Sequence, residues 1–190
     1  MSDYLINTPE DYNKIYQKST NDVEEFWGTL AKDNFKWQKP WNSVLEWDFS
    51  KPEVKWFRGS KLNITENCID RHLKNNGDKT AIIFEPNDIN DKSEHISYGD
   101  LYKRVNRMAN VLKDIGVKKG DRVCIYLPMI PELAVSVLAC ARIGAVHSVV
   151  FAGFSSSALS TRINDCQCEV VITSDGSFRG NKIKKKKKIV

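Results

Sequence analysis

The clearest pattern of hydrophobic and polar positions lies between residues 122 and 173, where short apolar runs alternate with helical repeats. Residues 123–127, 145–151 and 169–173 are rich in β-branched side chains, as in strands buried on both faces of a parallel sheet. Between them, residues 131–142 and 156–165 carry apolar side chains at helical spacing. The pattern therefore predicts a βαβαβ unit with a parallel sheet, in the α/β fold class.

Residues at the ends of these segments support the same boundaries. Pro128 stops the first strand, and Pro131 is tolerated in a first helical turn. Gly144 is typical of a helix C-terminus, and Ser155 can cap the next helix. Ligands of open parallel sheets bind beyond the carboxyl ends of the strands, so we expect function in the loops that follow the three strands.

Further elements are expected before this unit. A stripe of apolar residues predicts an amphipathic helix that ends near Gly116, and Ser97 with Asp100 resembles a capping box at its start. The stripe consists of Leu101, Val105, Met108, Ala109 and Leu112. Residues 80–85 and 95–96 predict a hairpin, and helices are expected from residue 63 to 73 and from about residue 21.

The segment before residue 63 is unusual in its aromatic content and has little periodicity. Trp37, Trp41, Trp47 and Trp56 lie among prolines and lysines. We expect an extended arm whose tryptophans anchor it on a larger surface, because each ring buries a large area for few ordered residues. Since lysines are interleaved with the rings, stacking on nucleic-acid bases is the alternative.

Cysteine content and charge narrow the class of protein. The five cysteines are odd in number and lie mostly in apolar elements, which favours reduced thiols and a reducing compartment. No apolar run suits a signal segment or a membrane span, so we expect a cytoplasmic protein with no membrane partner.

Without the five lysines of residues 184–188, positive and negative residues are equal in number at 24. We interpret these lysines as a solvated tail and assign no nucleic-acid partner.

Candidate catalytic groups are sparse. His72, His95 and His147 are far apart and adjoin no nucleophile or carboxylate pair, so we assign none of them to catalysis. Cys166 and Cys168 have no second pair of ligands at zinc-binding spacing. We therefore name no catalytic and no metal-binding residue.

The loop of residues 174–182 combines small residues with two cations after the third predicted strand, a composition that suits a phosphate ligand. The spacing of Gly176, Gly180 and Lys182 differs from that of a P-loop. A solvated turn is the alternative interpretation.

Longer strings of residues recur in a fixed order along almost the whole chain. They occupy residues 39–41, 45–47, 54–57, 62–72, 126–132, 141–155 and 174–182. Together they resemble the AMP-forming acetyl-CoA synthetases of the adenylate-forming superfamily. The resemblance implies a partial adenylate-forming amino-terminal domain, with the parallel βαβαβ core preceded by the tryptophan-rich arm.

The resemblance also implies a reaction and a set of ligands. Such ligases join acetate to ATP as acetyl-adenylate with magnesium, and CoA then displaces AMP. In the family, the loop at Phe151 and Gly153 lies against the CoA nucleotide, and an element that here reads Arg179, Gly180, Asn181 and Lys182 holds its phosphates. Glycine permits close approach of a ligand, and arginine offers two parallel hydrogen bonds to phosphate.

We divide the chain into an amino-terminal arm of residues 1–62, the first part of an AMP-binding domain at 63–182, and a lysine-rich tail at 183–190. After Lys182 the sequence departs from the family. We therefore expect the ATP, metal and acyl sites to be absent and the chain alone to be inactive. A frameshift in an adenine tract is our hypothesis for the lysines.

Two other functions remain open. One is a standalone CoA-binding or regulatory module, and the other is a propionate–CoA ligase fragment.

Overall fold

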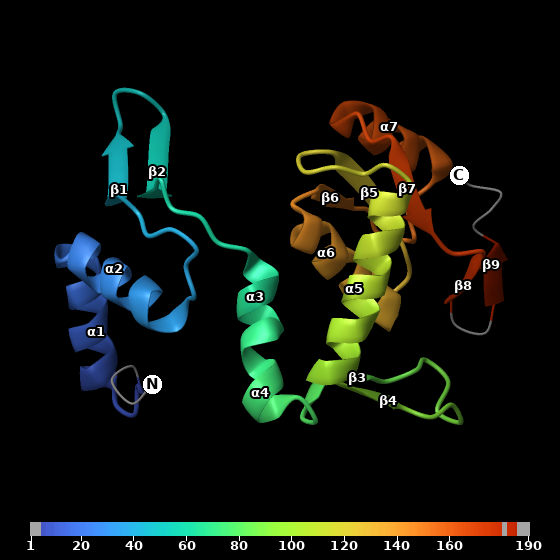
Figure 1. The fold of residues 1–190 in the computed structure, drawn as a ribbon, viewed down its shortest axis with the longest axis horizontal. Coiled ribbons are helices and arrows are strands. Elements are labelled where there is room, and N and C mark those ends of the chain that lie inside the picture. The colour runs from blue at the N-terminus through green and yellow to red at the C-terminus, as the bar shows by residue number, and fades with distance from the viewer. Residues whose placement is uncertain (1–4, 180–181, 186–190) are drawn as a thin grey trace. The chain divides into compact units, whose positions relative to one another are not determined.

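The computed structural model describes residues 5–179 and 182–185, and it divides the chain into two compact units, Met1–Asn63 and Ile64–Val190 (Figure 1). Each unit has its own packing, and the candidate site belongs to the second. Among the described residues, no helix is long and apolar enough to cross a bilayer.

The first unit contains two helices and a hairpin: α1 (Pro9–Asn21), α2 (Val23–Asn34), β1 (Ser43–Asp48) and β2 (Glu53–Arg58). Helix α1 begins at a capping box in which Thr8 accepts from the Asp11 amide while the Asp11 carboxylate accepts from the Thr8 amide. The tryptophan-rich segment, expected as an irregular extended arm, is instead an antiparallel hairpin in which Leu45 faces Trp56 and Trp47 faces Val54.

Packing between rings explains why this segment forms a hairpin. The ring of Trp41 lies 5.1 Å from those of Trp37 and Phe57, and the Trp27 ring of α2 lies 6.2 Å from that of Trp56. The rings therefore pack on one another, and each such pair adds to the area that the unit buries.

The second unit begins with a broken helical segment and a hairpin. The elements are α3 (Ile64–Cys68), the 3-10 turn η2 (Asp70–His72), α4 (Leu73–Asn76), β3 (Thr80–Phe84), β4 (Glu94–Ser97) and α5 (Tyr98–Asp114). A single helix over residues 63–73 was expected, but Ile69 leaves the helical conformation with φ −127° and its side chain is fully buried. Burial of Ile69 thus outweighs helix continuity. The capping interaction of Ser97 with Asp100 and the apolar stripe of α5 are confirmed.

The predicted βαβαβ unit is confirmed. It comprises β5 (Arg122–Tyr126), α6 (Pro131–Ile143), β6 (Val146–Val149), α7 (Ser156–Cys166) and β7 (Val170–Thr173). The strands are parallel in the order β6-β5-β7, so the chain crosses from one side of β5 to the other. Gly144 adopts φ 76° at the end of α6, the left-handed conformation for which glycine is preferred there.

Successive side chains of β5 point into two separate cores. Val123 and Ile125 pack with α5 and α6, whereas Cys124 and Tyr126 pack with Leu159 of α7. The sheet is therefore covered on both faces, as parallel sheets require. An antiparallel pair, β8 (Gly176–Arg179) and β9 (Lys182–Lys185), follows β7.

Candidate functional site

The carboxyl edge of the parallel sheet is built around a buried tyrosine. Tyr126 ends β5 with 0% of its surface exposed. Its hydroxyl donates to the main-chain carbonyl oxygens of Phe154 at 2.9 Å and Ala152 at 3.1 Å, in the loop between β6 and α7. Burial raises the pKa of Tyr126, so the hydroxyl keeps its proton and remains a donor. This contact holds the β6–α7 loop against the central strand.

The loop itself presents an exposed ring. Phe151 is 63% exposed and meets Phe154 edge to face at 5.8 Å, and the guanidinium of Arg162 lies 4.5 Å from the centre of the Phe154 ring. Gly153 lies directly beneath Phe151, because a Cβ atom at this position would be 2.5 Å from Phe151 Cε1. The predicted residues Phe151 and Gly153 are thus brought together in one tight turn, with the Phe151 ring facing solvent.

The loop after β7 is tied to the same central strand. Thr173 Oγ1 donates to the Tyr126 carbonyl oxygen at 3.2 Å, and Ser174 Oγ donates to the Gly176 carbonyl oxygen at 2.9 Å. The chain then enters β8, where Arg179 is the register partner of Lys182 in β9. The predicted residues Gly180 and Asn181 lie outside the described residues.

The topology places these two loops at neighbouring positions of one edge. Because β6 and β7 lie on either side of β5, their carboxyl ends are separated by two strand spacings, roughly 10 Å. An exposed ring and a glycine follow one strand, and a segment containing Arg179 and Lys182 follows the other.

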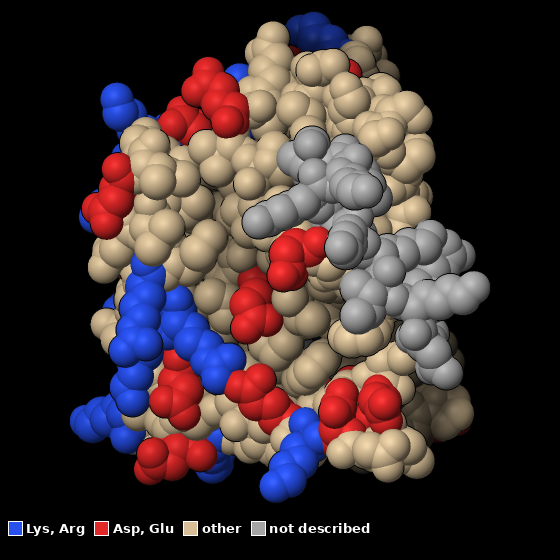
Figure 2. Space-filling view, turned by 90° about the vertical axis from the view of Figure 1, so that its right-hand side faces the viewer, with Lys and Arg blue, Asp and Glu red and all other residues tan. Residues whose placement is uncertain are grey.

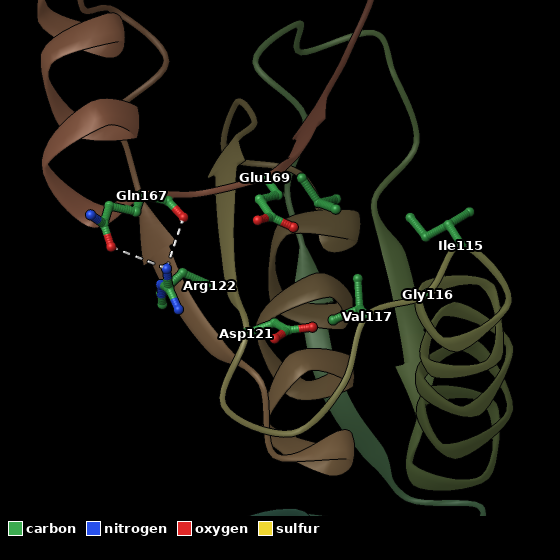
Figure 3. A pocket seen from close by; sticks show the side chains of 8 residues that line it. Ile115, Gly116, Val117, Asp121, Arg122, Gln167 and Glu169 are labelled. Carbon is green, nitrogen blue, oxygen red and sulfur yellow. Dashed lines mark hydrogen bonds between the residues drawn. The ribbon is translucent and has the colours of Figure 1, made fainter.

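A small pocket of about 100 Å³ lies at the opposite edge, at the amino ends of β5 and β7 (Figure 3). Asp121, Arg122, Gln167 and Glu169 are among its lining residues. Arg122 is engaged there, since its Nε donates to the Cys166 carbonyl oxygen at 3.1 Å and its Nη2 to that of Gln167 at 3.2 Å. We do not choose this pocket as the candidate ligand site, because open parallel sheets bind their ligands at the carboxyl edge.

Other candidate groups do not assemble into a catalytic site. His95 and His147 are exposed, and His72 packs against the Tyr98 ring at 4.9 Å. Within residues 5–179 and 182–185, no group of histidine, cysteine or carboxylate side chains is arranged to hold a metal ion. On the face shown in Figure 2, Lys and Arg side chains gather mainly at the lower left, with Asp and Glu side chains beside them and across the centre.

Comparison with known families and proteins identifies the chain. Residues 69–190 match the AMP-binding enzyme family, and residues 12–68 match the acetyl-coenzyme A synthetase N-terminus. The chain belongs to the AMP-binding enzyme family. The expected resemblance is thereby confirmed.

Two similar proteins are both named acetyl-coenzyme A synthetase. An acetyl-coenzyme A synthetase of Halorhodospira halophila is 55% identical over 173 residues, which are 91% of this chain and 27% of that protein. An acetyl-coenzyme A synthetase of Alkalilimnicola ehrlichii is 54% identical over 92% of this chain and 27% of its own length. The chain thus spans about 27% of the length of these relatives.

A solved structure shows the same fold. An acetoacetyl-CoA synthetase from Streptomyces lividans superposes with a TM-score of 0.85 at 27% identity, over 94% of this chain and 27% of that one. The α/β architecture is therefore the amino-terminal part of the fold of these AMP-binding enzymes.

Proposed function

We propose that this chain is the amino-terminal part of an AMP-forming acetate–CoA ligase, which makes acetyl-CoA from acetate, ATP and CoA through an acetyl-adenylate. The observation that carries the proposal is the 55% identity with an acetyl-coenzyme A synthetase, about twice the 27% identity with an acetoacetyl-CoA synthetase. The same difference favours acetate over acetoacetate as the acyl substrate. ATP, magnesium and acetate would be held mainly by the part of the protein that this chain does not span.

Within this reaction, the chain's own loops would hold CoA. The exposed ring of Phe151, supported edge to face by Phe154, offers a flat surface against which the CoA nucleotide can stack. Gly153 allows the Phe151 ring to take this position, because the space that a Cβ would occupy is taken by the ring. Arg179 and Lys182, with Gly180 and Asn181 between them, would neutralise the CoA phosphates, arginine through paired hydrogen bonds.

The test is a chimera in which residues 12–182 replace the matching segment of the Halorhodospira synthetase. We expect acetate-dependent pyrophosphate exchange and acetyl-CoA formation. Arg179→Ala should raise the CoA KM roughly ten- to a hundred-fold, as expected for a lost charged hydrogen bond, and leave pyrophosphate exchange near normal. Arg107→Ala, on the exposed face of α5, is the matched control. A chimera that exchanges pyrophosphate and whose CoA KM is unchanged by Arg179→Ala would contradict the CoA site.

A standalone CoA-binding module is the second candidate. It would bind CoA as the isolated chain, and that binding would be lost with Arg179→Ala. We expect the isolated chain to show no acetate-dependent pyrophosphate exchange. The five free cysteines agree with a location in the reducing cytoplasm, which we include in the proposal.

A further inference from the structure

Three thiols from separate elements lie near one another toward the amino ends of the parallel strands. The proposed CoA loops lie at the other, carboxyl ends. Cys124 lies in β5, Cys166 ends α7, and Cys168 precedes β7. Cys168 packs against the buried core that contains Cys124, and the Cys166 thiol donates to Ser148 Oγ of β6 at 3.6 Å. Sequence spacing alone indicated only the pair Cys166 and Cys168, because Cys124 is 42 residues before Cys166.

The turn between Cys166 and Cys168 sets their spacing. Gln167 adopts φ 53° and ψ 45°, the left-handed helical conformation, while the Cys168 amide donates to the Ile163 carbonyl oxygen at 3.0 Å. A residue with helical dihedrals of either hand holds the Cα atoms on its two sides about 5.4 Å apart, as helix radius and rise dictate. Disulfides form at Cα separations of roughly 4.4 to 6.8 Å, whereas a fully extended Gln167 would place the two Cα atoms at or beyond the upper end of this range.

The surroundings of Cys168 oppose ionisation of its thiol. Burial, and to a smaller extent the neighbouring Cys166 thiol, raise the pKa of Cys168. The Arg122 guanidinium opposes this rise, since it lies close enough to stabilise a Cys168 thiolate. Arg122 also donates to the carbonyl oxygens of Cys166 and Gln167, as Figure 3 shows for Gln167, and so holds the turn in place.

We propose that Cys166 and Cys168 are a reversible dithiol site that is oxidised to a disulfide by peroxides. One thiolate attacks a peroxide oxygen, the O–O bond breaks, and the sulfur becomes a sulfenic acid while the peroxide is reduced to water or an alcohol. The second thiol then attacks this sulfur and water leaves, so two thiols and one hydrogen peroxide give one disulfide and two waters. A dithiol reductant reverses the reaction.

Oxidation would change the contacts of α7 and the sheet. A disulfide holds its sulfur atoms about 2.05 Å apart, much closer than two thiols that are not bonded to each other. Cys166 would then lose its hydrogen bond to Ser148, and Cys168 would withdraw from the core that holds Cys124. The end of α7 would become covalently fixed to the start of β7.

The test is peroxide treatment of the folded chain, alkylation of free thiols, and mass spectrometry after trypsin. Cleavage after Arg162 and Arg179 yields a peptide of residues 163–179, in which Cys166 and Cys168 are the only cysteines. We expect this peptide to lose two hydrogens and become resistant to alkylation, and to regain both thiols with dithiothreitol. The rate should rise with pH, because the thiolate is the nucleophile.

Substitutions test whether the disulfide requires Cys166, Cys168 and the turn at Gln167 that lies between them. Cys166→Ser and Cys168→Ser should each abolish the disulfide, whereas Cys68→Ser, which removes an exposed cysteine, should retain it. Gln167→Gly keeps the left-handed turn accessible and should also retain it. The proposal is wrong if the folded chain gives only sulfinic acid on this peptide, or if urea-unfolded chain forms the disulfide as fast as folded chain.

Discussion

The hydroxyl of Tyr126 and the carbonyl oxygen of Phe154 lie 2.9 Å apart although 28 residues separate them in sequence. This hydrogen bond joins the end of the central strand to the loop whose exposed ring we assign to CoA. The shape of that loop thus depends on a residue whose ring is buried in the core with Leu159 of α7.

Tyr126→Phe should therefore destabilise the chain and loosen the loop. The substitution keeps the ring but leaves the Ala152 and Phe154 carbonyl oxygens without this donor, so we expect a loss of about 1–2 kcal/mol in the free energy of unfolding. Urea denaturation measures it. Tyr12→Phe, at an exposed position of α1, should change stability by less than about 0.5 kcal/mol. Equal effects of the two substitutions would contradict the anchoring role.

Gly153→Ala should be destabilising because of the Phe151 ring. The new Cβ would lie 2.5 Å from Phe151 Cε1, so the ring must move from its present position. In a Phe151→Ala background this clash is absent, and Gly153→Ala should then cost less. A double-mutant cycle on unfolding free energies measures the difference, which we expect at about 1 kcal/mol. If the coupling free energy between the two substitutions were zero, the cost of Gly153→Ala would not come from the Phe151 ring.

Asp70→Asn should weaken the packing of the broken helical segment on α6. Arg142 Nη2 lies 2.9 Å from Asp70 Oδ1, and the two side chains are 18% and 29% exposed. Because solvent screens this pair in part, we expect a loss of about 1–2 kcal/mol, more than for a fully exposed pair. Lys55→Ala, which breaks the exposed pair with Glu53, is the control and should have little effect. If Lys55→Ala lowered the free energy of unfolding by as much as Asp70→Asn, the partly buried pair would not be the stronger of the two.

Thiol reactivity should follow burial. Burial raises the pKa of Cys124 and of Cys140 to about 11, so at pH 8 only about one thiol in a thousand is ionised at each site. Cys68 is exposed, and we expect a disulfide reagent at pH 8 to label it first. Cys124 and Cys140 should react at a comparable rate only after unfolding in urea, or as the pH rises toward 11. Rapid labelling of Cys140 in folded chain would show that α6 opens locally.

The order of the central elements could be predicted because periodicity and end residues agree there. Pro131 and Gly144 lie at the two ends of α6, as expected. Elsewhere, tertiary packing decided the outcome. The helix expected over 63–73 breaks at Ile69, whose burial the local pattern does not show. Helix α1 was missed although Thr8 and Asp11 form a capping box, because its residues are mostly polar and none of them is buried.

For the candidate site, the sequence indicated the loops but not the contacts that shape them. Phe151 and Gly153 follow a predicted strand, so their location at the carboxyl edge could be inferred. The role of Tyr126 depends on contacts 26 and 28 residues away, which no local pattern encodes. The signal available was a tyrosine in an otherwise apolar buried strand, since a buried hydroxyl needs a partner.

The central position of β5 has a consequence for the order in which the sheet opens. Its main chain is hydrogen-bonded to β6 on one side and to β7 on the other, while its side chains fill both cores. Each amide of β5 donates to only one of these neighbours, so separation of one flanking strand frees alternate amides and leaves the others bonded. The whole of β5 therefore exchanges only when both ladders open. In hydrogen exchange, the amides of Cys124 and Ile125 should thus mark the slowest unit of this chain, the last to yield its protons to solvent.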